Sequence, residues 1–181
     1  MARLQPLVEP WSDEVAALLA AYPQADGVLL SLFRTFANSP RFLRKGVPNL
    51  LDKASPLPLR WREIVILRVT AMRACEYEWG VHVAIFAAAA RLDAAQIAAT
   101  CAPAIDAGLW SPAEAVLLAV VDELLTTGRL ATATQDAFET HFDLAQQLEI
   151  LALCGAYQTI SFVANVAGLP PELFAARFPA A

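Results

Sequence analysis

The sequence has few cysteines, and none is placed to pair with another. The three, Cys75, Cys101 and Cys154, are widely spaced, and no Cys-x-x-Cys motif occurs. An odd number at these spacings excludes the disulfide framework of a small secreted protein. The first residues also lack the apolar run of a signal peptide, so we expect a cytoplasmic protein.

Charge is also scarce. Charged residues make up 17% of the 181 residues, against 57% for hydrophobic ones. The net charge is −5 and no basic run occurs, which argues against nucleic acid or an anionic membrane as a partner. The mean hydropathy of +0.47 is high for a soluble monomer and favours apolar surface covered by further copies of the chain. Residues 150–169 are apolar but carry Gln158, Ser161 and Asn165, so we expect a buried core helix there and no membrane span.

Apolar residues recur at helical spacing along most of the chain, and strand-like alternation is rare. This pattern predicts an all-α fold of about eight helices, forming one domain over residues 1–181. The clearest linker is residues 53–58, and the pattern leaves open whether the chain bends near Ala74. We expect helices to start after Ser12, Asp26, Pro40 and Pro58, near Ala74, after Asp93 and Ser111, at about Thr134, and after Asp143. The first should end at Pro23, the second should contain Val28 and Leu29, and the one that starts near Ala74 should end at Arg91. Gly128 and Gly168 should end the helices that start after Ser111 and Asp143.

Ionisable and aromatic side chains are concentrated between Glu63 and His82. Within this stretch Cys75, Glu78 and His82 are three and four residues apart, a spacing that places them on one helical face. A thiol, a carboxylate and an imidazole on one face can supply a nucleophile, an orienting group and a base. We therefore take this stretch as the candidate active site.

Each of these residues also has a purely structural interpretation. Cys75 is either a thiol activated in the first turn of a helix or a small buried hydrophobe. His82 is either a general base or a core histidine bonded to a carbonyl. Glu63 precedes an apolar run, so it is either a buried proton relay with a raised pKa or an exposed first-turn acid. Glu76 is expected to face solvent or a partner, whereas Cys101 and Cys154 are expected to be packing residues.

The remaining side chains of the stretch bear on substrate binding and on metal binding. Tyr77 and Trp79 are candidates for lining a substrate pocket, or for interface or core packing. Glu78 and His82 form a Glu-x-x-x-His pair, a spacing at which both side chains can bind one metal ion. No second cluster of histidine or cysteine in the sequence completes such a site. We therefore expect neither a metal nor another cofactor.

Three motifs together resemble the carboxymuconolactone decarboxylase and alkyl hydroperoxidase D-like family. They are Arg-Glu63-Ile-Val-Ile-Leu-Arg-Val, Cys75-Glu-Tyr-Glu78-Trp-x-x-His82, and Ala-x-x-x-Arg-Leu-Asp. The resemblance extends over residues 28–168 and is most specific over residues 57–92. It implies a helical fold that assembles into homo-oligomers, commonly trimers or hexamers.

In hydroperoxidase-type members of this family, a glutamate, a Cys-x-x-Cys pair and a histidine reduce a hydroperoxide. The resemblance assigns three of these positions to Glu63, Cys75 and His82, but Glu78 replaces the second cysteine. No disulfide can close within this motif, so Cys75 would pass through a sulfenic acid that an external thiol resolves. The expected function is thus a thiol-dependent hydroperoxide reductase, with Cys75 as nucleophile, His82 as base, and Glu63 and Glu78 as the proton relay.

Two alternatives remain open at this stage. Decarboxylase-type members act on a carboxylated lactone without the cysteine pair, and Arg68, Arg73 and His82 are the nearby groups that could hold such a substrate. The other alternative is a non-catalytic oligomeric module in which Tyr77 and Trp79 form an interface. Family membership alone does not choose among the three.

Overall fold

The computed structural model describes residues 4–25 and 27–180, and it confirms the predicted all-α class. Within these residues a single pair of two-residue strands, β1 and β2, accompanies the helices. The helices are α1 (Asp13–Leu19), α2 (Ser31–Phe36), α3 (Pro40–Lys45), α4 (Leu59–Met72), α5 (Glu76–Phe86), α6 (Ala94–Ala99), α7 (Pro112–Thr127), α8 (Thr132–His141) and α9 (Leu144–Ala167), with a short 3-10 helix, η1 (Ala107–Leu109).

The helix ends follow the predicted capping residues. Capping boxes open α6 at Asp93, α7 at Ser111 and α9 at Asp143. In each one the capping side chain accepts a hydrogen bond from a first-turn N–H that has no partner inside the helix. Gly128 and Gly168 end α7 and α9 with φ of 72° and 62°, a conformation that glycine adopts without steric cost.

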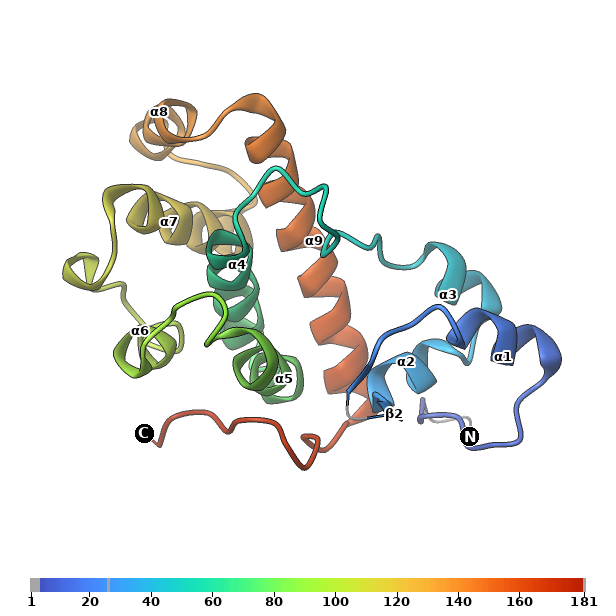
Figure 1. The fold of residues 1–181 in the computed structure, drawn as a ribbon. Coiled ribbons are helices and arrows are strands. Elements are labelled where there is room, and N and C mark those ends of the chain that lie inside the picture. The colour runs from blue at the N-terminus through green and yellow to red at the C-terminus, as the bar shows by residue number, and fades with distance from the viewer. Residues whose placement is uncertain (1–3, 26, 181) are drawn as a thin grey trace.

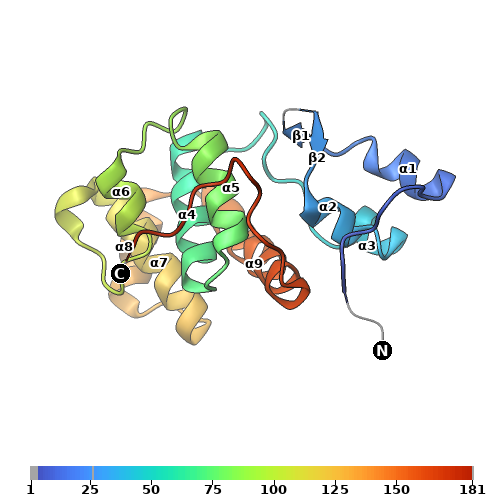
Figure 2. The ribbon, with the colours of Figure 1, turned by 90° about the horizontal axis from the view of Figure 1, so that it is seen from below.

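Helix α4 lies at the centre of the bundle and packs against α5, α7 and α9. Figure 1 shows α6, α7 and α8 on one side of α4, and α1, α2 and α3 grouped beyond α9 on the other. The residues of α4 from Glu63 to Thr70 are all buried, which fits its position among three neighbouring helices. The last described residues leave α9 and run as an irregular segment across α5 (Figure 2).

Three predicted helix boundaries are wrong. Helix α2 begins at Ser31, because Val28–Leu29 forms β2 and pairs with β1 (Gln24–Ala25) across Gly27, whose φ is 77°. The predicted cap Asp26 lies outside the described residues. Helix α1 ends at Leu19, before the expected stop at Pro23. Helix α5 ends at Phe86, and the chain then turns through Arg91, whose φ of 56° is left-handed.

Helix α9 is long and apolar enough to cross a membrane by length and composition alone. Half of its most apolar window is buried within the protein, and it packs on α4, α5 and α7. Core helices of soluble proteins meet the same criterion, and the packing agrees with the expected core helix.

Candidate functional site

A tight turn between α4 and α5 places Cys75 at the start of α5. Ala74 adopts a left-handed conformation with φ of 49°, and its N–H donates to the Ala71 carbonyl at 2.9 Å. The Cys75 N–H donates to the Thr70 carbonyl, also at 2.9 Å. This pair of bonds ends α4, and Cys75 then serves as the N-cap residue of α5. The bend left open by the sequence is therefore real.

Glu63 of α4 and His82 of α5 form a buried ion pair. Glu63 Oε2 lies 2.8 Å from His82 Nδ1, and the two residues are 1% and 3% exposed. Burial excludes the interpretation of Glu63 as an exposed first-turn acid. The carboxylate partner of His82 excludes the other structural interpretation, a core histidine bonded only to a backbone carbonyl.

The second ring nitrogen of His82 has two neighbours. Nε2 lies 3.1 Å from the Tyr157 hydroxyl oxygen and 3.4 Å from Glu78 Oε1. The Tyr157 ring meets the imidazole edge to face, and Phe86 covers the ring from another side at a centroid distance of 5.1 Å. The imidazole is thus fixed at both nitrogens and packed against two aromatic rings.

These contacts make His82 a cation at neutral pH. Burial alone would lower the pKa of His82, but the Glu63 and Glu78 carboxylates outweigh it and raise the pKa to about 10. Both ring nitrogens are then donors, and Tyr157 accepts from Nε2. A cationic His82 can donate a proton, whereas the predicted role as a base requires the neutral imidazole.

The Cys75 thiol has no solvent exposure and lies close to Glu78 and Ser161. Burial raises its pKa to about 11, and the nearby Glu78 carboxylate acts in the same direction. The Glu78 backbone N–H and the Ser161 hydroxyl oppose this rise, although neither makes a full hydrogen bond to the sulfur. The helix start therefore does not produce a preformed thiolate, and a base must remove the proton during reaction.

Three buried oxygens around this centre have no hydrogen-bond partner among the described residues: Glu63 Oε1, Glu78 Oε2 and Ser161 Oγ. Buried polar atoms are normally paired, and an unpaired one costs about 1–3 kcal/mol. Two of them belong to carboxylates and can only accept. The centre is therefore suited to a small molecule that brings its own O–H groups.

The other predicted site residues have mainly structural contacts. The Trp79 indole N–H donates to Thr100 Oγ1 at 3.0 Å, so Trp79 serves packing. The Tyr77 hydroxyl donates to Glu172 at 2.7 Å, and Tyr77 also lines a surface cavity, as one of its two predicted roles requires. Glu76 is partly exposed, as expected, and accepts a hydrogen bond from the Phe178 backbone N–H at 3.0 Å.

Arg68 and Arg73 do not point to a substrate acid. Arg68 pairs with Asp122 through two nitrogens at 2.6 and 2.8 Å and donates to the Thr100 carbonyl. Arg73 donates to the Leu125 carbonyl at 2.6 Å and to Gln158. Their guanidinium groups are engaged in holding helices and loops together. Of the two other cysteines, Cys154 is buried and Cys101 is half-buried.

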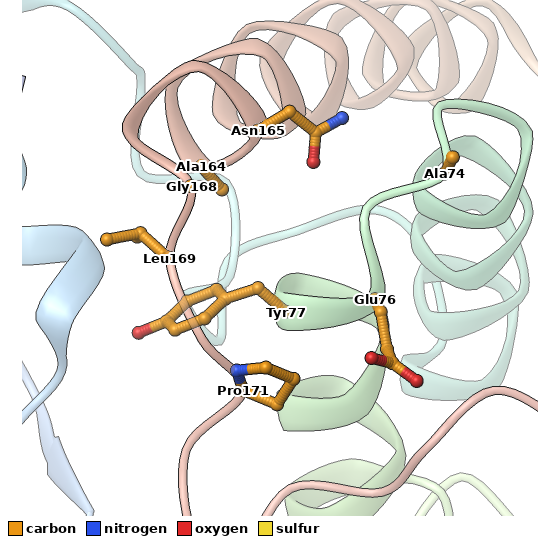
Figure 3. A pocket seen from close by; sticks show the side chains of 8 residues that line it. All are labelled: Ala74, Glu76, Tyr77, Ala164, Asn165, Gly168, Leu169 and Pro171. Atoms are coloured by element: carbon orange, nitrogen blue, oxygen red, sulfur yellow. The ribbon is translucent and has the colours of Figure 1, made fainter.

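A shallow cavity of about 300 Å³ lies beside the start of α5 (Figure 3). The residues on either side of Cys75, Ala74 and Glu76, form part of its lining, together with Asn165 of α9. Leu169 and Pro171, which follow α9, close it from another side. The cavity is a hollow on the protein surface from which a small molecule can approach this part of α5.

Fold and site together define a helical protein with a buried carboxylate–imidazole–thiol centre. Residues 46–122 match the sequence model of the carboxymuconolactone decarboxylase family, and the matched part of the chain holds Glu63, Cys75, Glu78 and His82. None of the curated proteins matches the sequence.

Two solved structures share the fold. An uncharacterised peroxidase-related protein from Silicibacter sp. TM1040 superposes with a TM-score of 0.75, at 17% identity, over 95% of this chain and 94% of its own. A protein of unknown function from Agrobacterium tumefaciens, described as a candidate antioxidant defence protein AhpD, has a TM-score of 0.57 at 18% identity, over 67% of this chain and 83% of its own. At these identities the likeness establishes the alkyl hydroperoxidase D-like fold and leaves the reaction open.

Proposed function

We propose that this protein is a thiol-dependent hydroperoxide reductase that uses Cys75 as its only reacting thiol. The observation that carries the proposal is a protonated His82 in contact with two carboxylates, one of which, Glu78, lies close to the buried Cys75 thiol. This arrangement holds both groups that the reaction needs, a base for the thiol proton and an acid for the leaving oxygen. The peroxidase-related and antioxidant descriptions of the two structural neighbours support the same reaction class.

The chemical step balances with the residues present. Cys75 sulfur attacks the terminal oxygen of R–O–OH while its proton passes to Glu78, the O–O bond breaks, and His82 gives a proton to the leaving alkoxide. The products are the Cys75 sulfenic acid and an alcohol. One external thiol then forms a mixed disulfide with loss of water, and a second thiol releases Cys75. Proton return from Glu78 to His82 restores the starting state.

The charge of the centre favours a neutral substrate. Glu63 and Glu78 as carboxylates and His82 as a cation sum to one negative charge, held in a buried environment. A hydroperoxide is neutral and can donate its O–H to the unpaired Glu78 Oε2. A carboxylated lactone would bring further negative charge, and Arg68 and Arg73, the two arginines considered for holding it, are engaged elsewhere.

The test compares hydroperoxide consumption by the parent and by three variants, with dithiothreitol as the external thiol. Cys75→Ser should lose all activity above background, whereas Cys154→Ser, at the other buried cysteine, should retain it. His82→Gln should lose about 10²-fold or more, as expected for removal of a general acid. Trapping with dimedone should label Cys75 in the parent after one addition of hydroperoxide.

Equal rates for Cys75→Ser and the parent would overturn the proposal. Turnover of a carboxylated lactone that survives Cys75→Ala but is lost in His82→Gln would assign the decarboxylase chemistry instead.

We also propose that the protein functions as a homo-oligomer, a trimer or hexamer as the family resemblance implies. Support comes from α9, which exposes a row of large apolar side chains along one face: Leu144, Leu148, Leu151, Phe162 and Val166. They are four, three, eleven and four residues apart, and each of these spacings returns to the same helix face, as in a face that packs on another helix. Light scattering in line with size exclusion tests this, and a molar mass of 19.5 kDa, that of one chain, would contradict it.

A further inference from the structure

The irregular segment from Leu169 to Ala180 is attached to α5 along its length (Figure 2). The Ala176 N–H donates to the Gly80 carbonyl at 3.1 Å, and the Phe178 N–H donates to Glu76. Glu172 of the segment accepts a hydrogen bond from the hydroxyl of Tyr77, the residue that follows Glu76 in α5. The segment thus covers the first two turns of the helix that starts at Cys75.

Gly80 fits this contact closely. A Cβ atom built on Gly80 would lie 2.2 Å from the Ala176 carbonyl oxygen, far inside any real contact distance. Glycine in a helix interior costs about 0.5–1 kcal/mol relative to alanine. Gly80 lies where the segment contacts the backbone of α5, and the absence of a side chain there allows this contact.

The same segment closes the cavity beside Cys75. Leu169 and Pro171 line it opposite Ala74 and Glu76, the two residues that flank the thiol (Figure 3). Cys75 itself is 0% exposed, so no reagent reaches its sulfur in the closed arrangement. Access requires a part of the surrounding structure to move.

The segment has few buried side chains, although Glu172 also accepts a hydrogen bond from the Ser31 backbone N–H at 2.8 Å. From Pro170 to Ala180 no residue is fully buried, and Leu173 is entirely exposed. Its one aromatic anchor on α5 is Phe178, whose ring lies 5.1 Å from that of Trp79. Segments with few buried contacts open at a lower free energy than the packed core.

We infer that residues 169–180 form a lid, and that small hydroperoxides and thiols reach Cys75 through the cavity when this lid leaves α5. The use of the lid in turnover rests on the proposed function. The lid itself does not, because it limits the access of any thiol reagent to Cys75.

The experiment measures the rate of N-ethylmaleimide alkylation at each cysteine by peptide mass spectrometry, at one pH. Gly80→Ala forces the segment off α5 and should raise the rate at Cys75 by at least about tenfold, with Cys154 unchanged as the internal control. Gly155→Ala is the matched control, because its Cβ meets nothing within 4 Å, and should leave the rate at Cys75 unchanged. A chain ending at Leu169 should be alkylated at Cys75 at least as fast as Gly80→Ala. If this shorter chain does not fold, the comparison of Gly80→Ala with the parent still tests the lid.

Equal rates at Cys75 in the parent and in Gly80→Ala would overturn the lid, and so would a parallel rise at Cys75 and Cys154, which indicates general loosening. The two proposals fail separately. If Gly80→Ala is alkylated faster at Cys75 but neither it nor the parent consumes hydroperoxide, the reductase proposal is refuted and the lid proposal stands. Hydroperoxide consumption by the parent with unchanged alkylation in Gly80→Ala refutes the lid alone.

Discussion

Replacing Glu63 by glutamine tests the charge on His82 directly. Glutamine keeps the size of the side chain and one hydrogen bond to Nδ1 but removes the carboxylate that stabilises the imidazolium. Burial then has less opposition, so the pKa of His82 should fall in the variant. The stability of the protein should fall with it, because part of the buried pair is left uncompensated.

The magnitude follows from the pKa of His82. A rise from the ordinary value of about 6.5 to about 10 corresponds to at most about 5 kcal/mol, at 1.36 kcal/mol for each pKa unit. Because glutamine retains a hydrogen bond, we expect Glu63→Gln to lose about 3 kcal/mol of unfolding free energy near pH 6.

The sign of the pH dependence is fixed by the direction of the pKa change. The folded-state pKa of His82 lies above the unfolded one, so its contribution is complete below about pH 6.5 and is lost as the pH rises towards 10. The free-energy difference between the parent and Glu63→Gln should therefore shrink across this range.

Urea unfolding followed by circular dichroism, repeated from about pH 6 to about pH 10, measures that difference. The chain has two histidines, and His141→Gln, at the exposed end of α8, is the control that should leave the pH profile in place. A difference between parent and Glu63→Gln that stays constant over the whole range would refute the assignment of a proton to the buried pair.

Three further changes have defined outcomes. Tyr157→Phe removes the partner of His82 Nε2 and should cost about 1 kcal/mol in urea unfolding and lower the rate of hydroperoxide consumption. Glu78→Cys creates a Cys-x-x-Cys pair with Cys75, so hydroperoxide should produce an internal disulfide, seen as a loss of two hydrogens by mass under non-reducing conditions. Gly128→Ala places a side chain at φ 72° and should lower the unfolding free energy by about 1 kcal/mol, measured in the same way.

The parts of the site that the sequence predicted are those encoded over short distances. Glu63, Cys75 and His82 lie within twenty residues, and their spacing matched a family motif that placed them together. The N-cap residues Asp93, Ser111 and Asp143 were equally local, and each was confirmed. Local patterns of this kind depend only on backbone geometry within a few turns.

Contacts between distant segments could not be predicted in the same way. Tyr157 meets His82 across 75 residues of sequence, and nothing in the spacing of α9 distinguishes it from other buried residues. Glu76 accepts a hydrogen bond from the Phe178 backbone N–H, 102 residues away, and no local pattern indicated this contact. The charge on His82 also depends on the balance between burial and two carboxylates, and that balance is set only by the assembled core.

The turn at Ala74 has a consequence for how the centre responds to motion. Cys75 belongs to both helices at once, since its N–H closes α4 and its carbonyl accepts the first hydrogen bond of α5, from Trp79 at 3.1 Å. Glu63 moves with α4, whereas His82 and Glu78 move with α5. A small rotation of one helix against the other about this junction would therefore change the distance between acid and imidazole while leaving the sulfur almost in place. Such a rotation would alter the Glu63–His82 pair while Cys75 and Glu78 keep their places relative to one another.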